Sequence, residues 1–262
     1  MLANVKSCAV IGLDGVVVDV EVDTRSGLPA VVIVGLPDAA VQESRERVQS
    51  AIKNASLPYP RNRIIVNLAP ASIRKVGPIY DLPIAVGVLI AAGALSPKAV
   101  DDALLIGELS LDGSLRHVSG VLPMADLARR EGITRLYVPD VDAPEAALIP
   151  DIEVIPISSL AALYNHLKGI EVIPPLDPPE AIFHPAEGQT DFREIKGQEH
   201  VKRALEVAAA GGHNILLTGP PGSGKTLMAR AMPNILPRFT LEEACLLYTS
   251  PSPRDRTRSR MP

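Results

Sequence analysis

The residues best suited to chemistry in this sequence form a phosphate-binding loop, a glycine followed by four residues and then Gly-Lys-Thr. Its members are Gly219, Pro220, Pro221, Gly222, Ser223, Gly224, Lys225 and Thr226. The three glycines let the backbone approach a triphosphate closely, because no Cβ stands in the way. The pattern predicts that Lys225 reaches the β- and γ-phosphates of a bound nucleotide and that Thr226 ligates the accompanying Mg²⁺.

The segments on either side of the loop are those that such a loop needs. Residues 214–218, Asn-Ile-Leu-Leu-Thr, are predicted to form a short buried strand, and residues 226–232 the start of a helix. A strand–loop–helix turn aims several backbone N–H groups at one point, where an anion binds. This context argues against the alternative, a glycine-rich turn with a chance lysine.

Length and composition set limits on the rest of the chain. The 262 residues suggest one or two domains, and a hydrophobic content of 47% is ample for a packed core. The net charge of −4 gives no overall attraction to nucleic acid, although a local basic patch is left open. Cys8, Cys245 and the five histidines show no ligand spacing, so no metal other than the nucleotide's Mg²⁺ is predicted.

Nothing in the sequence predicts a membrane partner. Acidic residues interrupt the first apolar run, which argues against a signal peptide. The longest apolar run, residues 82–95, is shorter than the roughly 20 residues that span a bilayer. We therefore expect a cytoplasmic protein, which a reducing compartment and two unpaired cysteines also fit.

The first 170 residues alternate strand and helix patterns and predict one mixed α/β, or α+β, domain. Strands are expected at residues 7–11, 16–22, 30–34, 63–68, 104–110 and 114–116. Turns at Asp14-Gly15 and Asp112-Gly113 are expected to close two hairpins. Asp38 is expected to cap a helix that runs to about Asn54, a buried helix follows from Asp81, and helices and strands alternate over residues 121–168.

The remaining residues predict a linker and a second domain. Residues 171–190 contain five prolines, a density that stops regular structure and marks a linker between domains. The second domain is expected at residues 191–244, with a helix over residues 198–210 before the phosphate loop.

Residues 245–262 differ from everything before them. They are rich in arginine, serine and proline and show neither a helical nor a strand period. Such a basic tail is suited to binding nucleic acid. The alternative that we favour is a non-native segment joined to a fold that is interrupted after Ala244.

Two sets of motifs resemble one family. Residues 192–198, residues 208–214 and the phosphate loop are similar to Mg-chelatase-like AAA+ ATPases, of the competence-associated ComM/YifB type. In the first domain, residues 34–38, 67–71 and 75–85 resemble the N-terminal domain of the same family. The resemblance covers about residues 1–244, and its motifs are specific in combination.

The resemblance implies a first domain with the fold of the Lon proteolytic domain. Lon-type proteolysis needs a serine nucleophile, which follows a Gly-Pro pair in Lon proteases, and a lysine base. Here Gly77-Pro78 is followed by Ile79-Tyr80-Asp81, and no lysine occurs between Lys98 and Lys168. We therefore predict a Lon-like domain that is not a peptidase.

For the second domain, the resemblance implies an ATPase that uses ATP and Mg²⁺. Ile195, Gly197 and Gln198 are expected on the adenine side of the nucleotide. Hydrolysis also needs an acidic Walker B pair, a polar sensor and an arginine finger, all expected beyond residue 244, so no catalytic residue is predicted within this chain. An interrupted sheet also predicts that residues 1–168 fold independently while residues 191–262 are partly mobile.

Family members form hexamers, and the ComM type is linked to DNA branch migration in recombination and transformation. The resemblance therefore implies self-association and a DNA partner for the complete protein. Two alternatives stay open: a chelatase-type ATPase that remodels a protein partner, and a nucleotide-binding module without hydrolysis.

Overall fold

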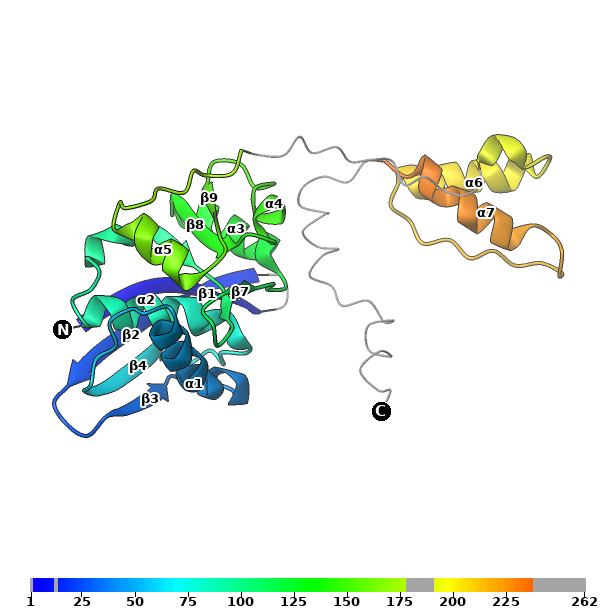
Figure 1. Cartoon of the computed structure of the whole chain (residues 1–262). Helices are drawn as coiled ribbons and strands as arrows, with labels where there is room; N and C mark the ends of the chain where they lie inside the picture. Colours follow the sequence, from blue (N-terminus) through cyan, green and yellow to red (C-terminus); the bar gives the residue numbers. More distant parts are fainter. Residues whose placement is uncertain (1, 12–13, 178–190, 238–262) are drawn as a thin grey trace. The chain divides into compact units, whose positions relative to one another are not determined.

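The computed structural model describes residues 2–11, 14–177 and 191–237 (Figure 1). These residues divide into two compact units, one within residues 1–179 and one within residues 180–244. Each unit is described by itself. The tail, residues 245–262, and most of the proposed linker lie outside the described residues, so the predicted domain boundaries stay predictions.

A seven-stranded sheet of order β3-β4-β2-β1-β5-β8-β9 forms the centre of the N-terminal unit. Its strands are β1 Leu2–Ile11, β2 Asp14–Arg25, β3 Ala30–Val34, β4 Arg63–Ala69, β5 Ala103–Leu105, β8 Arg135–Pro139 and β9 Glu153–Ile157. Strand β2 is antiparallel to both neighbours, and every other pair in the sheet is parallel. The predicted fold class, mixed α/β, is therefore confirmed.

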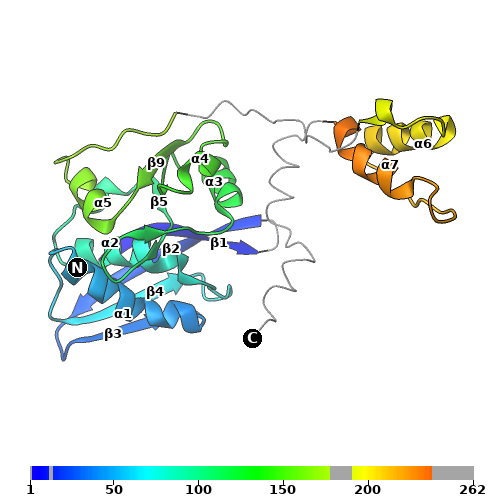
Figure 2. The same ribbon diagram turned by 45° about the vertical axis from the view of Figure 1, so that its right-hand side comes forward.

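Helices cover both faces of this sheet (Figures 1 and 2). They are α1 Ala39–Asn54, α2 Asp81–Ala91, α3 Val121–Arg130, α4 Ala143–Ala146 and α5 Leu160–Leu167, with the 3₁₀ turns η1 Pro78–Tyr80 and η2 Pro97–Ala99. The largest core cluster joins α1, α2 and α5 to one face of the sheet. Helix α3 packs on the other face, where Leu127 leaves no room for a Cβ at Gly15.

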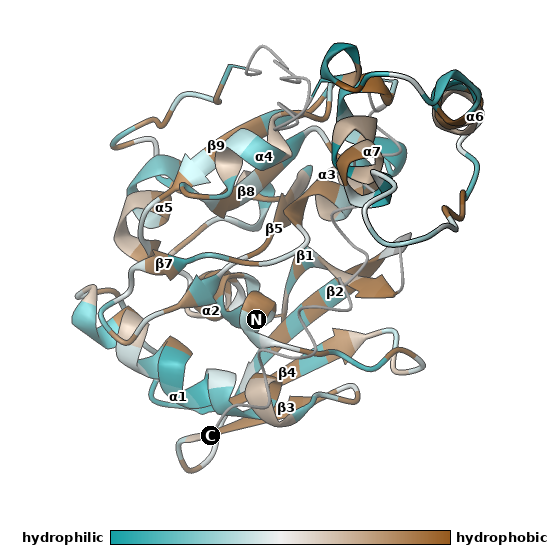
Figure 3. Ribbon diagram, turned by 90° about the vertical axis from the view of Figure 1, so that its right-hand side faces the viewer, coloured by the Kyte–Doolittle hydropathy of each residue, from teal (hydrophilic) through white to brown (hydrophobic). Residues whose placement is uncertain are grey.

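The sequence explains why these helices lie where they do. Every residue of α2 is buried, as its uninterrupted apolar run predicts. Helix α1 is amphipathic: it buries Val41, Val48 and Ile52, and its other face is hydrophilic (Figure 3). The carboxylate of Asp38 accepts a hydrogen bond from the Val41 N–H at 2.8 Å, so the predicted helix cap is confirmed.

Two details of the predicted hairpins were wrong. Ile11 pairs with Asp14, so Asp14-Gly15 lies inside β2 and is not the turn. Residues 104–110 do not form one strand. Gly107, whose N–H donates to the Ile79 carbonyl, separates β5 from the short hairpin of β6 Glu108–Leu109 and β7 Leu115–Arg116. That hairpin does turn at Gly113, which has a φ of +88°.

The second unit contains helices but no strand among residues 191–237. Its elements are η3 Phe192–Glu194, α6 Glu199–Ala210, α7 Lys225–Ala231 and η4 Met232–Ile235. Ile195, Leu205, Met228 and Ala231 form its buried core. The predicted strand over residues 214–218 was wrong, because a strand needs a hydrogen-bonded neighbour and no described segment of this unit supplies one.

Among the described residues, no helix is long and apolar enough to cross a membrane.

Candidate functional site

The phosphate loop runs from Gly219 into the first turn of α7. Gly219, Gly222 and Gly224 have φ angles of +156°, +79° and +82°. These values lie in the left-handed region, where a side chain is strained and glycine is not. The glycine spacing of the motif therefore matches the backbone shape that the loop adopts.

Lys225 folds back over the loop. Its ammonium nitrogen lies 2.8 Å from the Gly219 carbonyl oxygen, 2.7 Å from that of Pro220 and 3.2 Å from Ser223 Oγ. The Ser223 hydroxyl also donates to the Pro220 carbonyl at 2.9 Å. Lys225 thus supplies a positive charge inside the curve of the loop, where the N–H groups of a helix's first turn also have no intrahelical acceptor.

Helix α7 begins at Lys225, with Gly224 as its N-cap. Thr226 occupies the next position of the first turn and is exposed. A threonine hydroxyl is an oxygen ligand of the kind that Mg²⁺ accepts. Its position beside the lysine fits the metal role predicted for it, and that role remains a prediction.

The segment before α6 contacts the loop. The Gln198 side-chain amide donates to the Ser223 carbonyl at 3.3 Å. Gly197 and Gln198 are both left-handed, with φ of +74° and +61°, and this turn carries the chain into α6. Ile195 is only 6% exposed and belongs to the same core cluster as Met228 of α7. All three residues predicted for the adenine side therefore lie on the segment that supports the loop.

Two hollows flank this contact. One, of about 270 Å³, is bounded by Gly219, Pro220, Ser223 and Lys225 on one side and by Gln198, His200, Val201 and Leu217 on the other. The second, of about 400 Å³, is bounded by Ile195, Gln198, Gly222, Gly224 and Met228 among others. Gln198 borders both hollows, whereas Gly197, Pro221 and Thr226 border neither.

His200, Val201 and Leu217 border the hollow of about 270 Å³, and the sequence did not assign them to the site. Leu217 belonged to the predicted strand, and the other two lie on the first turn of α6. For Val201 the available signal was its spacing from Gln198, since side chains three positions apart at a helix start share a face. No such spacing places His200 or Leu217 at the hollow.

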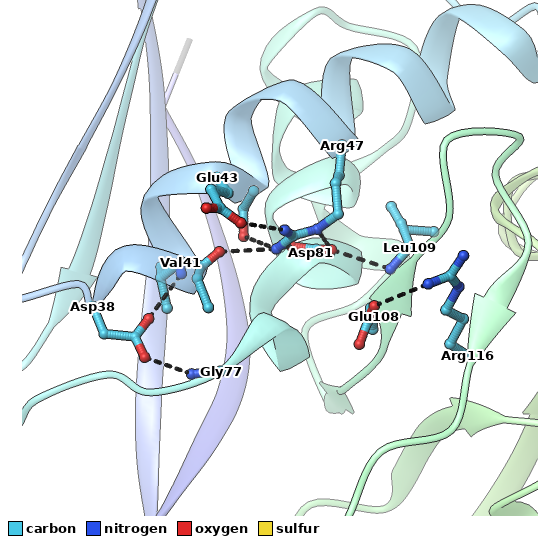
Figure 4. A network of polar contacts seen from close by, with 11 residues as sticks. Asp38, Val41, Glu43, Arg47, Gly77, Asp81, Glu108, Leu109 and Arg116 are labelled. Carbon is cyan, nitrogen blue, oxygen red and sulfur yellow. Dashed lines mark hydrogen bonds and ion pairs between the residues drawn. The ribbon is translucent and has the colours of Figure 1, made fainter. Parts of the chain in front are cut away.

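In the N-terminal unit, the residues after Gly77-Pro78 occupy the position of the nucleophile in Lon proteases. Tyr80 and Asp81, which follow Gly77-Pro78, are both fully buried. The Asp81 carboxylate accepts hydrogen bonds from Arg47 Nε at 2.7 Å and from the Leu109 N–H at 3.2 Å (Figure 4). This position is filled by a buried carboxylate that pairs with the partly exposed Arg47, and it offers no exposed nucleophile. The absence of peptidase activity stays a prediction.

Fold and loop together place the chain among mixed α/β proteins with a phosphate loop. Residues 20–142 match the family model described as subunit ChlI of Mg-chelatase, and residues 191–257 match the model described as magnesium chelatase, subunit ChlI. The chain belongs to the Mg-chelatase-like ATPase family, and within it to the ComM/YifB type.

Similar proteins come from several bacteria. The chain is 40% identical over 246 residues to the competence protein ComM of Haemophilus influenzae, and 40% identical over 243 residues to YifB of Escherichia coli. It is 41% identical over 243 residues to an uncharacterized protein of Mycobacterium tuberculosis. Each match covers 93% of this chain but only 47–48% of the relative, so the chain spans about half the length of these relatives.

A shorter match joins the chain to a protease. An archaeal Lon protease of Archaeoglobus fulgidus is 39% identical over 62 residues, which is 24% of this chain and 10% of the protease. This partial similarity fits the predicted combination of a Lon-like domain and the start of a phosphate-loop domain.

Proposed function

We propose that this chain is the ATP-binding half of an AAA+ motor whose complete form remodels DNA, by branch migration, during recombination and transformation. The observation that carries the ATP-binding part is the loop itself. Three left-handed glycines shape it, Lys225 lies within its curve, and Gln198 holds it from the neighbouring segment. The DNA-remodelling part is supported by the 40% identity to a protein named for competence.

The residues present fit ATP and Mg²⁺. The loop offers one lysine and the N–H groups of a helix start, which suits phosphate, and Thr226 offers a hydroxyl oxygen for the metal. Ile195 and Gln198 border the hollow beside Gly222 and Gly224, on the side proposed for adenine. Hydrolysis of bound ATP would supply the free energy for movement. The residues described here bind and orient, and hydrolysis is assigned to groups beyond residue 244.

The remaining properties of the complete protein belong to the same proposal. It acts in the cytoplasm as a hexameric ring that contains the neighbouring subunit's arginine finger, and its partner is DNA. A ring fits a motor of this class, because each nucleotide site is completed by the adjacent subunit.

The first test is nucleotide binding by this chain, followed with a fluorescent ATP analogue and Mg²⁺. Lys225→Ala removes a charged hydrogen-bond donor, an interaction of roughly 1.5–3 kcal/mol, so Kd should rise by about 10- to 150-fold. Arg203→Ala removes one positive charge from an exposed position of α6 and should leave Kd within about twofold. Equal affinity of the wild type and Lys225→Ala would contradict ATP binding at the loop.

The second test concerns the complete protein on a four-way DNA junction. ATP-dependent branch migration that is lost in Lys225→Ala is the expected result. Two family models named for a chelatase subunit favour the other candidate, an ATPase that remodels a protein partner. ATP turnover without branch migration would support that candidate, and binding without turnover would indicate a nucleotide-binding module.

A further inference from the structure

The two edge strands of the N-terminal sheet differ in whether another segment of the chain covers them. Along β9, the chain that follows α5 returns to the edge, and the Leu176 N–H donates to the Val154 carbonyl at 2.8 Å. Within residues 2–11, 14–177 and 191–237, strand β3 at the opposite edge pairs with β4 alone. Apart from β4, the one described group that bonds to the β3 backbone is the Gln42 side chain, which donates to the Ile33 carbonyl at 3.4 Å.

Strand β3 also lacks the features that protect open edges. Its sequence, Ala-Val-Val-Ile-Val, contains no charge, no proline and no glycine. Leu28 before it is 88% exposed, and Val34 and Leu36 at its end are 42% and 56% exposed. Natural proteins block exposed edge strands of this kind with lysine, proline or a bulge, because an open edge accepts another strand. The unprotected edge of β3 therefore indicates a surface that a binding partner covers when the protein functions.

A hollow of about 310 Å³ lies beside the first half of this edge. It is lined by residues of the β3 edge, of α1 and of the loop after α1: Pro29, Ala30, Val31, Arg45, Glu46, Gln49, Tyr59 and Asn62. Side chains that alternate along an added strand need such a space between the sheet edge and the covering helix.

Positive charge gathers at the same end of the sheet. The strand register places Arg63 of β4 opposite Arg25 of β2 on one side and opposite Ala30 of β3 on the other. Like charges directly opposite each other destabilise a sheet. Arg61 and Arg63 are exposed and form no ion pair with any described residue. We call Arg25, Arg45, Arg61 and Arg63 the arginine end; within it Asp23 pairs with Arg25, and Glu46 lies beside Arg45.

We propose that the open edge of β3 and the arginine end together bind an extended, acidic peptide segment of a partner protein, which adds to the sheet as a further strand. Backbone hydrogen bonds along β3 supply part of the affinity, and carboxylates of the peptide meet the guanidinium groups. The site lies in the N-terminal unit and does not depend on the nucleotide role proposed for the second unit.

Charge on the neighbouring strand favours a peptide over a nucleic acid. Asp19, Glu21 and Asp23 alternate along β2 on the same face as Arg25, and all three are partly exposed. A duplex lying across this face would bring its phosphates to that acidic row. A peptide that follows β3 lies at the edge nearest Arg61 and Arg63, and β3 and β4 separate it from the acidic row of β2.

The test uses the whole chain and a fluorescent peptide of about ten residues that alternates threonine and glutamate. The binding is measured at an ionic strength of about 50 mM, where surface charges are little screened. The double substitution Arg61→Ala, Arg63→Ala should weaken binding by at least about tenfold. The control Arg74→Ala, Arg130→Ala removes the same charge from two other exposed positions and should change Kd by less than about twofold.

Hydrogen exchange then separates strand addition from simple charge attraction. We expect the amides of residues 30–34 to exchange at least about fivefold more slowly with the peptide bound. Absence of peptide binding, or binding without this protection, would overturn the proposal. A duplex of about 20 base pairs that binds more tightly through Arg61 and Arg63 would assign the surface to nucleic acid instead. Self-association that protects residues 30–34 would assign it to a second copy of the chain.

Discussion

The two units differ in how they bury apolar side chains. In the N-terminal unit a seven-stranded sheet separates two helical layers, and one core cluster extends from α1 through α2 to α5. In the second unit only Ile195, Leu205, Met228 and Ala231 form the core cluster. There Leu216 is 86% exposed and Val207 is 51% exposed. The segment 214–217 is largely apolar, as β3 is. It forms no strand, because no neighbouring strand among the described residues pairs with it.

The difference teaches that an apolar run becomes a strand only when a neighbour supplies hydrogen bonds. Strand β3 lies beside β4, and its five residues are paired in register. Residues 214–218 have no regular secondary structure and no strand partner among the described residues. The phosphate loop is formed all the same, because Lys225, Ser223 and Gln198 fix it locally. Its shape therefore depends less on the sheet than its usual strand–loop–helix context suggests.

The largest effect is expected from breaking the buried ion pair of the N-terminal unit. Asp81→Ala leaves the buried Leu109 N–H without its acceptor, and the Arg47 guanidinium keeps the weaker acceptors Ala40 O and Ser44 Oγ. Removing one partner of a buried pair costs about 3–5 kcal/mol of folding free energy, and we expect about 3 kcal/mol here because the Arg47 side chain is 20% exposed. Urea unfolding followed by tyrosine fluorescence measures this, since four of the five tyrosines lie in residues 59–164.

The control for that experiment is a pair at the surface. Arg130 lies 2.9 Å from Asp126, and the two side chains are 48% and 25% exposed. Arg130→Ala should cost less than about 1 kcal/mol. If Asp81→Ala costs no more than this control, the buried network does not hold α1, α2 and β6 together as described.

Two leucines of the second unit test how much of its apolar surface contributes to stability. Leu205 is fully buried and Leu216 is 86% exposed. Leu205→Ala should cost about 2 kcal/mol, at the lower end for buried leucines because a small core relaxes easily, and Leu216→Ala should change stability by less than about 0.5 kcal/mol. Both changes in stability can be measured from the hydrogen-exchange rates of the α6 amides. A larger loss for Leu216→Ala would show that residues 214–218 are packed in solution.

The sequence predicted the elements that local signals define. Asp38 marks the start of α1, and the uninterrupted apolar run from Leu82 marks α2. Residue patterns failed where pairing with a segment distant in the sequence determines the secondary structure. Asp14-Gly15 has the composition of a turn, but the register of β1 and β2 places it in a strand. The strand expected at residues 214–218 failed for the same reason.

The candidate site shows the same division. The loop residues were evident from their spacing, because the chemistry needs them in one short segment. The contact between Gln198 and Ser223 joins segments 25 residues apart, and no local pattern records it. The arginine end is harder still, since Arg25, Arg45 and Arg63 come from three elements that only the sheet register and helix packing bring together.

Limited proteolysis tests the comparison as a whole. Protease cuts where the chain opens, and opening is easiest where few apolar contacts must be broken. We expect cleavage within residues 191–237 to be at least about tenfold faster than within residues 2–177, as mass spectrometry of the fragments would show. Equal cleavage rates would contradict the difference in burial, and ATP with Mg²⁺ should slow the cuts near the loop if the nucleotide binds there.

The smallest effect concerns the end of the N-terminal unit, at His166. Its Nδ1 accepts a hydrogen bond from the Ile173 N–H at 2.9 Å, which ties the chain after α5 to the unit. Burial lowers the pKa of His166 below its usual 6.5, and Arg135 lowers it further. Below pH 6.5 the unfolded chain takes up a proton that the native histidine resists, so stability contributed by neutral His166 is lost as the pH falls from about 7.5 through its folded pKa.

Thermal unfolding at pH 7.5 and pH 5.5 measures this contribution when the wild type is compared with His166→Gln. The substitution removes the titration, so the difference between the two proteins should narrow as the pH falls. Hydrogen exchange at Ile173 and Leu176 locates the effect, since both N–H groups hold the segment that covers the β9 edge. A gap between the two proteins that is independent of pH would show that His166 supports this edge by packing alone.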